Sequence, residues 1–184
     1  MYDRCTMIQK AQIMDEAAVT RALARITHEI IERNRGVEDL CILGVRRRGV
    51  PLARTLCQNI KRFEGVDVPI GELDITMHRD DLHHEQKLAT ATGSEFPCDI
   101  TDKTVLIVDD VMYTGRTARA AIETVFAFGR PKAVQLVALI DRGHRELPIR
   151  PDYVGKNLPT AKSETVAVYT KCIDGETAVY ICDL

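Results

Sequence analysis

The sequence predicts an α/β fold in which a parallel central sheet is flanked by helices. Short apolar runs typical of strands alternate along the chain with longer segments whose apolar residues recur at helical spacing, an order that favours a parallel sheet. The 184 residues are 45% hydrophobic, which suits a single domain, 1–184, with a real core. The formal charge is −2 and the pI about 6.2. This balance excludes a strongly basic, nonspecific nucleic-acid binder but allows a local basic face.

Apolar spacing and turn residues place the elements along the chain. Asp15 is expected to cap a first helix that runs to about Asn34, with its apolar residues on one face. Pro51 suits the first turn of a second helix. Residues 77–102 are highly polar without periodicity, and residues 141–163 are rich in Pro, Gly and Arg, so both are expected to be loops. The further expected elements are strands at 40–45, 104–108, 133–140, 165–169 and 178–181, an extended segment at 66–76, and helices at 51–63 and from 117 to 128.

The most informative segment of the chain is residues 104–117, TVLIVDDVMYTGRT. Its apolar start predicts a strand covered on both faces, with Asp109 and Asp110 at the carboxyl end, where open α/β sheets bind ligands. Thr114 and Gly115 then precede a helix N-terminus, where backbone N–H groups and the helix dipole accept a phosphate. Two neighbouring carboxylates can accept hydrogen bonds from a cis-diol or help to hold a hydrated divalent cation. A diol and a phosphate this close together describe a ribose 5-phosphate.

Residues 105–117 resemble the phosphoribosyl pyrophosphate (PRPP) binding motif of type I phosphoribosyltransferases. Other segments look like the PyrR family of bacterial pyrimidine-operon regulators, which are also uracil phosphoribosyltransferases. The similarity covers roughly residues 8 to 170. It implies a type I phosphoribosyltransferase-like fold with a small hood and a flexible loop. The segments that carry the PyrR resemblance are 74–82, 129–131, 141–150 and 152–160.

The resemblance implies a dual function. As an enzyme, such a protein joins uracil to PRPP and gives UMP and pyrophosphate, with Mg²⁺ bound together with PRPP. As a regulator, it binds pyrimidine-operon leader mRNA with UMP as effector and controls transcription attenuation. A homo-oligomer, dimer or higher, is expected, and no membrane partner. Two alternatives stay open: a phosphoribosyltransferase for another base without an RNA role, and an RNA-binding nucleotide sensor with vestigial catalysis.

Residue by residue, the resemblance assigns a PRPP site to the motif. Asp109 and Asp110 are the implied catalytic pair and the residues nearest the metal. Tyr113 stands where purine phosphoribosyltransferases that resemble this motif often carry an Asp, which favours uracil over a purine. The remaining implied PRPP-binding residues are Val105, Leu106, Ile107, Val108, Val111, Met112, Thr114, Gly115, Arg116 and Thr117.

Two further loops carry phosphate-binding candidates. Arg46, Arg47, Arg48 and Gly49 follow a strand and precede a helix, so three guanidiniums beside a glycine turn can clamp a pyrophosphate through bidentate hydrogen bonds. The alternative is a solvated basic loop. The position matches the pyrophosphate loop of the family, which commonly holds a non-proline cis peptide. In the implied flexible loop, Arg79 is the residue expected to reach a phosphate.

A basic face and a base pocket complete the candidate sites. Arg21, Arg25 and His28 recur by four and three, so they share one face of the first helix. Glu29 and Glu32 on the same helix favour the opposite interpretation, a solvated charged surface. The base-pocket candidates are Arg142, Gly143, Tyr153 and Val154. The further candidates for the RNA face are Arg145, Arg150 and Lys156.

The cysteines give no sign of a disulfide framework or a zinc site. The six are scattered, without a CxxC pair or zinc-like spacing. A signal peptide or a transmembrane run is not evident in the sequence either. We therefore expect the protein to act in a reducing cytoplasm.

Overall fold

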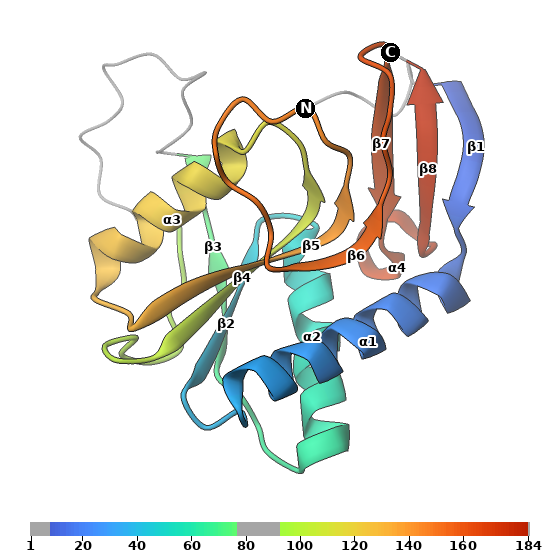
Figure 1. Ribbon diagram of the computed structural model, residues 1–184. Helices are drawn as coiled ribbons and strands as arrows, with labels where there is room; N and C mark the ends of the chain where they lie inside the picture. The colour runs from blue at the N-terminus through green and yellow to red at the C-terminus, as the bar shows by residue number, and fades with distance from the viewer. Residues whose placement is uncertain (1–7, 77–92, 184) are drawn as a thin grey trace.

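The computed structural model describes residues 8–76 and 93–183 (Figure 1). A five-stranded parallel sheet has the order β3-β2-β4-β5-β6, and a three-stranded antiparallel sheet has the order β1-β8-β7. The predicted parallel α/β fold is confirmed, and the structure adds a small antiparallel sheet to it. In chain order the elements are β1 (Ile8–Met14), α1 (Glu16–Asn34), β2 (Leu40–Val45), α2 (Gly49–Glu64), β3 (Ile70–Leu73), β4 (Thr104–Met112), α3 (Arg116–Phe128), β5 (Ala133–Asp141), β6 (Tyr153–Asn157), β7 (Glu164–Tyr169), α4 (Lys171–Asp174) and β8 (Ala178–Asp183).

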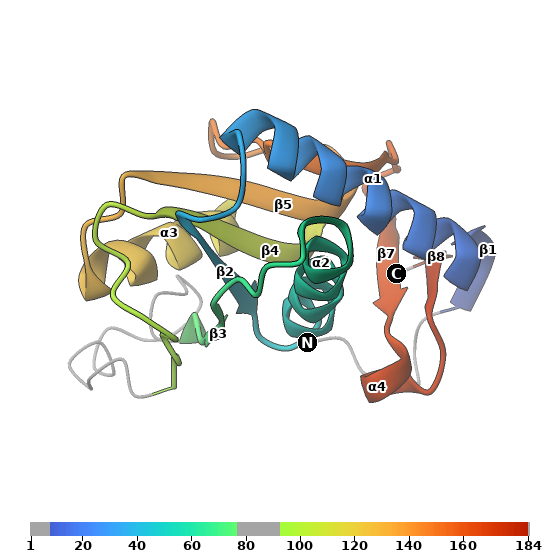
Figure 2. The same cartoon turned by 90° about the horizontal axis from the view of Figure 1, so that it is seen from below.

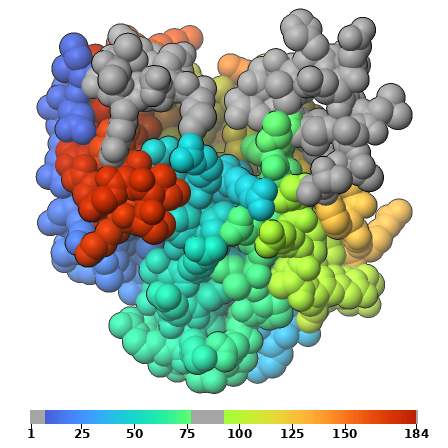
Figure 3. Space-filling view, turned by 180° about the vertical axis from the view of Figure 1, so that it is seen from behind, coloured from blue at the N-terminus to red at the C-terminus, as the bar shows by residue number. Residues whose placement is uncertain are grey.

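Helices cover both faces of the main sheet. Leu106 of β4 belongs to the core cluster that includes Ile26 of α1 and Leu56 of α2, whereas its neighbour Val105 belongs to the cluster that includes Ala121 of α3. All five side chains are completely buried. Successive side chains of a strand point to opposite faces, so a continuous apolar run is what a strand covered on both sides requires. Seen from below, α1 and α2 lie along the sheet apart from α3 (Figure 2), and α2 fills the middle of the rear face (Figure 3).

The strand order sets the place of the binding edge. The chain adds β3 on one side of β2, then returns to add β4 on the other side and continues outward. The direction of winding therefore reverses between β2 and β4. Ligands of open α/β sheets bind outside the carboxyl ends of the strands at such a reversal. The Arg46–Gly49 loop follows the carboxyl end of β2. Asp109 and Asp110 lie near the carboxyl end of β4.

Local signals explain most element boundaries. Asp15 caps α1 as predicted, with its carboxylate accepting the N–H of Ala18 at 2.7 Å. Helix α2 begins at Gly49, ahead of the predicted start at Pro51. Only Ile70–Leu73 of the extended segment at 66–76 pairs as a strand, with Ile42–Val45 of β2. Strand β4 continues through the acids to Met112, four residues beyond the predicted end, because β5 pairs with it as far as Asp141.

The clearest error of the sequence prediction is β6, which lies inside the segment 141–163 expected to be a loop. Tyr153–Asn157 pairs in parallel with β5, starting where Tyr153 faces Val137. As an edge strand it buries only its first residue fully, so it lacks the apolar run or alternation that identifies a strand. Its register is fixed from outside: the Asp152 carboxylate accepts the N–H of Leu136 at 2.9 Å.

Tyr153 belongs to the core and not to an open pocket, which corrects its assignment to the base pocket. Its side chain is 3% exposed. Its hydroxyl donates to Gln135 Oε1 at 2.8 Å and accepts from Asn34 Nδ2 at 3.2 Å, and the Gln135 amide donates back to Asn34 Oδ1 at 3.0 Å. The three side chains tie the last turn of α1 to β5 and β6. The register of β6 places Tyr153 in the middle of the sheet, away from its carboxyl edge.

Tyr153→Phe is expected to lower the free energy of unfolding by about 1–3 kcal/mol, because it removes one member of a buried hydrogen-bond network and leaves polar partners unsatisfied. Urea unfolding followed by circular dichroism measures the loss. Tyr180→Phe is the matched control, since the Tyr180 hydroxyl bonds only to Glu176, at the surface and at 3.4 Å, and should change the midpoint little. Equal losses in the two variants would show that the network does not hold α1 to the sheet.

Candidate functional site

Two carboxylates lie side by side near the carboxyl end of β4. Asp109 and Asp110 are both partly buried, and the Asp110 N–H donates to Asp109 Oδ1 at 3.0 Å. Burial, and then the charge of Asp110, raise the pKa of Asp109 well above its usual range. Burial also raises the pKa of Asp110, although the hydrogen bond with Asp109 and the charge of Arg48 oppose the rise. The folded protein therefore disfavours negative charge on the pair, and a cation or hydroxyl donors would stabilise that charge.

The turn after β4 leaves the N-terminus of α3 open. Gly115 precedes the helix with φ 96 and has no side chain to cap it. Within the described residues the Thr114 hydroxyl accepts only the N–H of Arg116, at 3.3 Å. A Cβ at Gly115 would approach Leu147 to 3.3 Å and would be strained at this φ, so the position favours glycine. The Thr114 carbonyl accepts the N–H groups of Glu146 and Leu147 at 2.9 and 3.1 Å, which fixes the turn. Uncapped N–H groups at a helix N-terminus form an anion site.

The apolar half of the motif has a structural role. Val105, Leu106, Ile107 and Val108 are at most 1% exposed, so these four predicted PRPP-binding residues have side chains that are closed to solvent. Their side chains fix β4 between the two helical layers and thereby place the acids that follow. Met112 is buried as well, at 5%.

The loop between β2 and α2 packs against β4 just before the acids. Gly49, its last residue, has no room for a side chain, because a Cβ there would lie 2.2 Å from the Val108 carbonyl oxygen and 3.4 Å from Asp109 Cα. The peptide bond between Arg46 and Arg47 is cis, as the resemblance to the pyrophosphate loop leads one to expect. The loop and the acid pair thus form one continuous edge.

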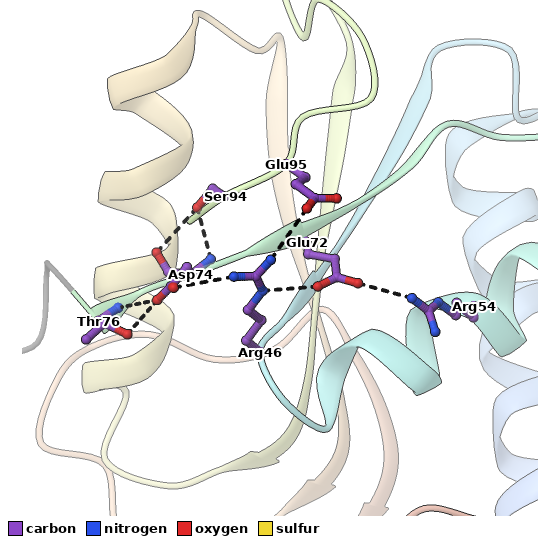
Figure 4. A network of polar contacts seen from close by, with 7 residues as sticks. All are labelled: Arg46, Arg54, Glu72, Asp74, Thr76, Ser94 and Glu95. Atoms are coloured by element: carbon purple, nitrogen blue, oxygen red, sulfur yellow. Dashed lines mark hydrogen bonds and ion pairs between the residues drawn. The ribbon is translucent and has the colours of Figure 1, made fainter. Parts of the chain in front are cut away.

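The three arginines of this loop are not equivalent, which corrects the prediction of three free guanidiniums. Arg46 is turned toward β3: its Nε donates to Glu72 at 3.0 Å, and its Nη atoms lie 3.5 Å from an Asp74 oxygen and 3.7 Å from a Glu95 oxygen (Figure 4). Arg47 is exposed and has no ion pair within residues 8–76 and 93–183. It is the guanidinium of the loop that remains available to an anion.

Arg48 joins the loop to the small sheet. Its Nε and Nη2 donate to the two carboxylate oxygens of Asp174 at 3.3 and 2.9 Å, and the Asp174 side chain is 4% exposed. Burial disfavours the charged form of Arg48, but the hydrogen bond and charge of Asp174, and then the charge of Asp110, outweigh it and raise the pKa of Arg48. The Arg48 guanidinium therefore bonds to Asp174, and its positive charge acts on Asp110 from there.

Tyr113 and Arg142 stack at the carboxyl ends of β4 and β5. The Arg142 Cζ lies 4.1 Å from the centroid of the Tyr113 ring, which is 39% exposed, and the His144 ring meets the same ring edge-on at 6.0 Å. Arg142 itself is 5% exposed, and burial lowers its pKa. Its guanidinium donates to the carbonyl of Glu164 and to the hydroxyl of Thr160. Arg142 therefore supports Tyr113 from beneath while its donors face the backbone of the small sheet.

A hollow of about 400 Å³ lies beside this stack. The sequence prediction of a base pocket in this region names one of its lining residues, Gly143, and misses His144 and Asn157. The available signal was their position at or near the carboxyl ends of strands β5 and β6, but β6 was not predicted. The lining residues are Asp141, Gly143, His144, Arg145, Arg150, Asn157 and Pro159.

Arg145 does not belong to a basic outer face. It bonds through Nη2 to the Asp141 carboxylate, through Nη1 to the carbonyl of Tyr113 at 2.7 Å, and through Nε to the carbonyl of Ile149 at 2.9 Å. Its side chain is 17% exposed. These interactions use its donors to shape the loop after β5, so nothing in the structure favours the predicted RNA contact of Arg145.

Other predicted members of the basic face do come together. Arg25 of α1 donates to the carbonyls of Val154 and Gly155 at 2.9 and 2.8 Å and pairs with Glu29. These contacts bring the helix face beside β6, where Lys156 is exposed. They also give Arg25 a structural role and use the Val154 carbonyl outside the base pocket.

His28 and Arg21 lie on the same exposed side of α1. The His28 ring stacks on Phe63 of α2, with ring centroids 4.3 Å apart. Arg21 and Arg150 are exposed and have no ion pair in the described part of the chain. Arg116, in contrast, pairs with Glu146 at 2.8 Å.

Some expectations concern residues that the structure does not describe. Arg79, the candidate of the implied flexible loop, lies within 77–92 and so outside the described residues. Within 8–76 and 93–183, no group of three or more His, Cys, Asp or Glu side chains could hold a metal ion. No helix in these ranges is long and apolar enough to cross a membrane.

Comparison with solved structures confirms the architecture. A hypoxanthine phosphoribosyltransferase from Trypanosoma cruzi in a ternary substrate complex aligns with a TM-score of 0.72 at 20% identity, over 95% of both chains. A hypoxanthine-guanine phosphoribosyltransferase from Bacillus anthracis aligns with a TM-score of 0.71 at 20% identity, over 96% of this chain and 99% of that one. At this identity the likeness shows the type I phosphoribosyltransferase fold and nothing more.

Comparison of sequences is more specific. The profile of the phosphoribosyl transferase domain matches residues 9–171. The chain is 60% identical over 168 residues to the bifunctional protein PyrR of Brevibacillus brevis, covering 91% of this chain and 94% of that protein. It is 57% identical over 180 residues to the bifunctional protein PyrR of Acetivibrio thermocellus, covering 97% of each. The chain therefore belongs to the phosphoribosyl transferase domain family and, within it, to the PyrR family.

Proposed function

We propose that this member of the PyrR family transfers the ribose 5-phosphate of PRPP to uracil, giving UMP and pyrophosphate, and binds pyrimidine-operon leader mRNA with UMP as effector. One observation carries the enzymatic part. The Arg46–Gly49 loop, the acids Asp109 and Asp110, and the uncapped N-terminus of α3 all follow or end strands β2 and β4, where the winding of the sheet reverses. A ribose with a phosphate at each end fits such an edge.

In this site the chain binds and orients the reactants. The N–H groups at the start of α3 hold the 5-phosphate, the acid pair accepts hydrogen bonds from the ribose hydroxyls, and Arg47 faces the pyrophosphate. The bond from the anomeric carbon to pyrophosphate breaks, a bond to a ring nitrogen of uracil forms, and that nitrogen loses its proton. Positive charge develops on the ribose ring meanwhile, beside the carboxylates. Positioning and electrostatic stabilisation therefore account for the catalysis.

The residues present fit a magnesium ion that arrives with PRPP. Asp109 and Asp110 are the two acids of β4, and they are adjacent. No group of three or more possible metal ligands occurs among the described residues. Mg²⁺ typically takes one or two carboxylates together with substrate phosphates and waters. When bound, the ion supplies charge neutralisation for the departing pyrophosphate. The raised pKa values of both acids, due first to burial, are those of a pair that a cation would relieve.

The RNA-binding role is supported by the basic surface where α1 meets β6. Arg21 and Lys156 are exposed, and the contacts of Arg25 with the Val154 and Gly155 carbonyls hold α1 and β6 together. His28 lies on the same helix, with its ring stacked on Phe63 of α2. Unpaired cations on one surface supply the salt-dependent affinity that phosphate backbones require. UMP can act as effector if it binds the RNA-competent state better than the alternative state.

We further propose that residues 1–184 act as one domain in a reducing cytoplasm. Arg48 with Asp174, and Arg142 with the Glu164 carbonyl, join the two sheets. The five cysteines of the described residues are free thiols, as a reducing compartment favours.

Asp109→Asn and Asp110→Asn are each expected to lower kcat/KM for PRPP by about a hundredfold, since both remove a charge aimed at the developing positive ring. A pyrophosphate-release assay with uracil measures the loss. Asp39→Asn, at the opposite, amino end of β2 and exposed, is the matched control and should keep normal activity. Retention of wild-type kcat/KM by both variants would place the ribose elsewhere. Uracil-independent or absent release in the wild type would favour another base or a vestigial site.

The same change at Asp109 should leave stability unchanged or raise it. Its raised pKa means that the folded state holds the proton more tightly than the unfolded chain, so this group destabilises the fold progressively as pH rises above the ordinary value of 3.8. Asparagine removes that effect at pH 7. Thermal unfolding of Asp109→Asn at pH 7 should therefore occur at the wild-type temperature or higher, which separates lost activity from lost folding.

Arg21→Ala combined with Lys156→Ala is expected to weaken leader-RNA binding and to flatten the salt slope by about two, one unit for each lost phosphate contact. Uracil phosphoribosyltransferase activity should stay normal. Titrations at several salt concentrations, with and without UMP, test both statements. Lys132→Ala removes an exposed cation at the start of β5 and is the control. An unchanged affinity and slope in the double variant would leave the protein an enzyme only.

We propose a homo-oligomer, dimer or higher. Two aromatic side chains of α3, Phe126 and Phe128, are 53% and 44% exposed, and a Phe128–Phe96 stack extends this apolar surface. Sedimentation velocity at micromolar concentration should show a species larger than one chain. A single monomeric boundary would refute the proposal.

A further inference from the structure

Arg46 is held against β3 through both its backbone and its side chain. Its backbone N–H donates to the Leu73 carbonyl at 2.9 Å. Its guanidinium faces three carboxylates: Glu72 of β3 at 3.0 Å, Asp74 at 3.5 Å and Glu95 at 3.7 Å. Figure 4 shows the guanidinium between these groups. Both ends of the residue are therefore fixed to β3 and its neighbour.

Glu72 is the centre of this arrangement. One of its oxygens accepts from Arg46 Nε at 3.0 Å, and the other accepts from Arg54 Nη2 of α2 at 3.1 Å. The Glu72 side chain is 25% exposed, less than Arg46 at 35% and Arg54 at 62%. Glu72 thus joins the loop before α2 to the body of α2 across the edge strand.

The surrounding acids are themselves held in place by hydrogen bonds. Asp74 accepts the hydroxyl and the N–H of Thr76, which are the main reason that its pKa is lowered, and Arg46 lowers it further. The Ser94 hydroxyl accepts the Asp74 N–H at 2.9 Å. Glu72 and Glu95 exchange backbone hydrogen bonds at 3.0 and 2.8 Å. An anion approaching Arg46 would have to displace these carboxylates and would meet their charge.

We propose that Arg46 is a positioning residue of the pyrophosphate loop, held by Glu72, and that it does not bind the pyrophosphate itself. The inference rests on the proposed phosphoribosyl transfer. The next residue, Arg47, carries the exposed guanidinium, and Gly49 fixes the far end of the loop against β4. Arg46 anchors the near end to β3. Loss of either partner of the Arg46–Glu72 pair therefore loosens the same anchor.

The test is a double-mutant cycle in the reverse reaction, UMP with pyrophosphate. Arg46→Gln and Glu72→Gln are each expected to raise the KM for pyrophosphate about tenfold. The KM of the double variant should lie within about twofold of the higher single-variant KM, because both changes remove one shared anchor. The KM for UMP should stay within about twofold of wild type. Arg46→Lys, which keeps a cation beside Glu72, should lie closer to wild type than Arg46→Gln.

Lys61→Ala is the matched control, since it breaks an exposed ion pair with Asp67 near the other end of α2, and it should leave both KM values unchanged. Circular dichroism and thermal unfolding confirm that each variant is folded. Calorimetric titration with pyrophosphate gives a second measure of affinity that does not depend on turnover.

Three outcomes would overturn the inference in an active wild type. Multiplicative effects of the two changes would mean that Arg46 and Glu72 act independently. A normal or lower KM for pyrophosphate in Glu72→Gln, together with a raised KM in Arg46→Gln, would make Arg46 a direct ligand. An equal rise in the KM for UMP would show general disruption. A wild-type protein that forms no PRPP from UMP and pyrophosphate and no UMP from uracil would instead overturn the proposed function, and with it the inference.

Discussion

The site depends on one close contact, between Gly49 and the backbone of β4. A Cβ at Gly49 would lie 2.2 Å from the Val108 carbonyl oxygen, so a side chain there would push the start of α2 away from the sheet. With glycine, the loop that leaves β2 passes directly over β4 beside Asp109. Two segments that come from separate strands are thereby joined into one edge. The winding of the sheet reverses between β2 and β4, and this contact brings the two segments together at that point.

The acid pair lowers the stability of the fold at neutral pH. Burial raises the pKa of Asp109 and of Asp110, so the folded chain pays an electrostatic penalty when both are ionised. The core beneath offsets it, because the residues that precede the acids on β4 are completely packed between the two helical layers. Strained or like-charged groups persist at functional sites where the surrounding structure holds them in place. A rigid strand that ends in repelling carboxylates is such a case.

The arginines divide between binding and construction according to where their partners lie. Arg46 is fixed to acids of β3 and of the segment that follows residue 93, and Arg48 to Asp174 at the end of α4, between β7 and β8 of the small sheet. Arg145 closes the loop after β5 through Asp141. Each guanidinium has donors in a planar fork, so a well-placed carboxylate occupies it. The loop therefore presents fewer free cations than its sequence contains, and those that are bound hold the two sheets and the loops in register.

The sequence by itself determined the parallel α/β fold, the cap at Asp15, the motif at 104–117 and the family, because each is encoded in contiguous residues. It did not predict β6 or the burial of Tyr153, and it did not distinguish the exposed Arg47 from its paired neighbours. These features depend on partners distant along the chain: Arg48 and Asp174 are 126 residues apart, and Tyr153 and Asn34 are 119 apart. A short edge strand has no apolar periodicity of its own, and the sequence around an arginine does not show whether its side chain is paired. Only the tertiary structure, which brings those partners within hydrogen-bond distance, decides such roles.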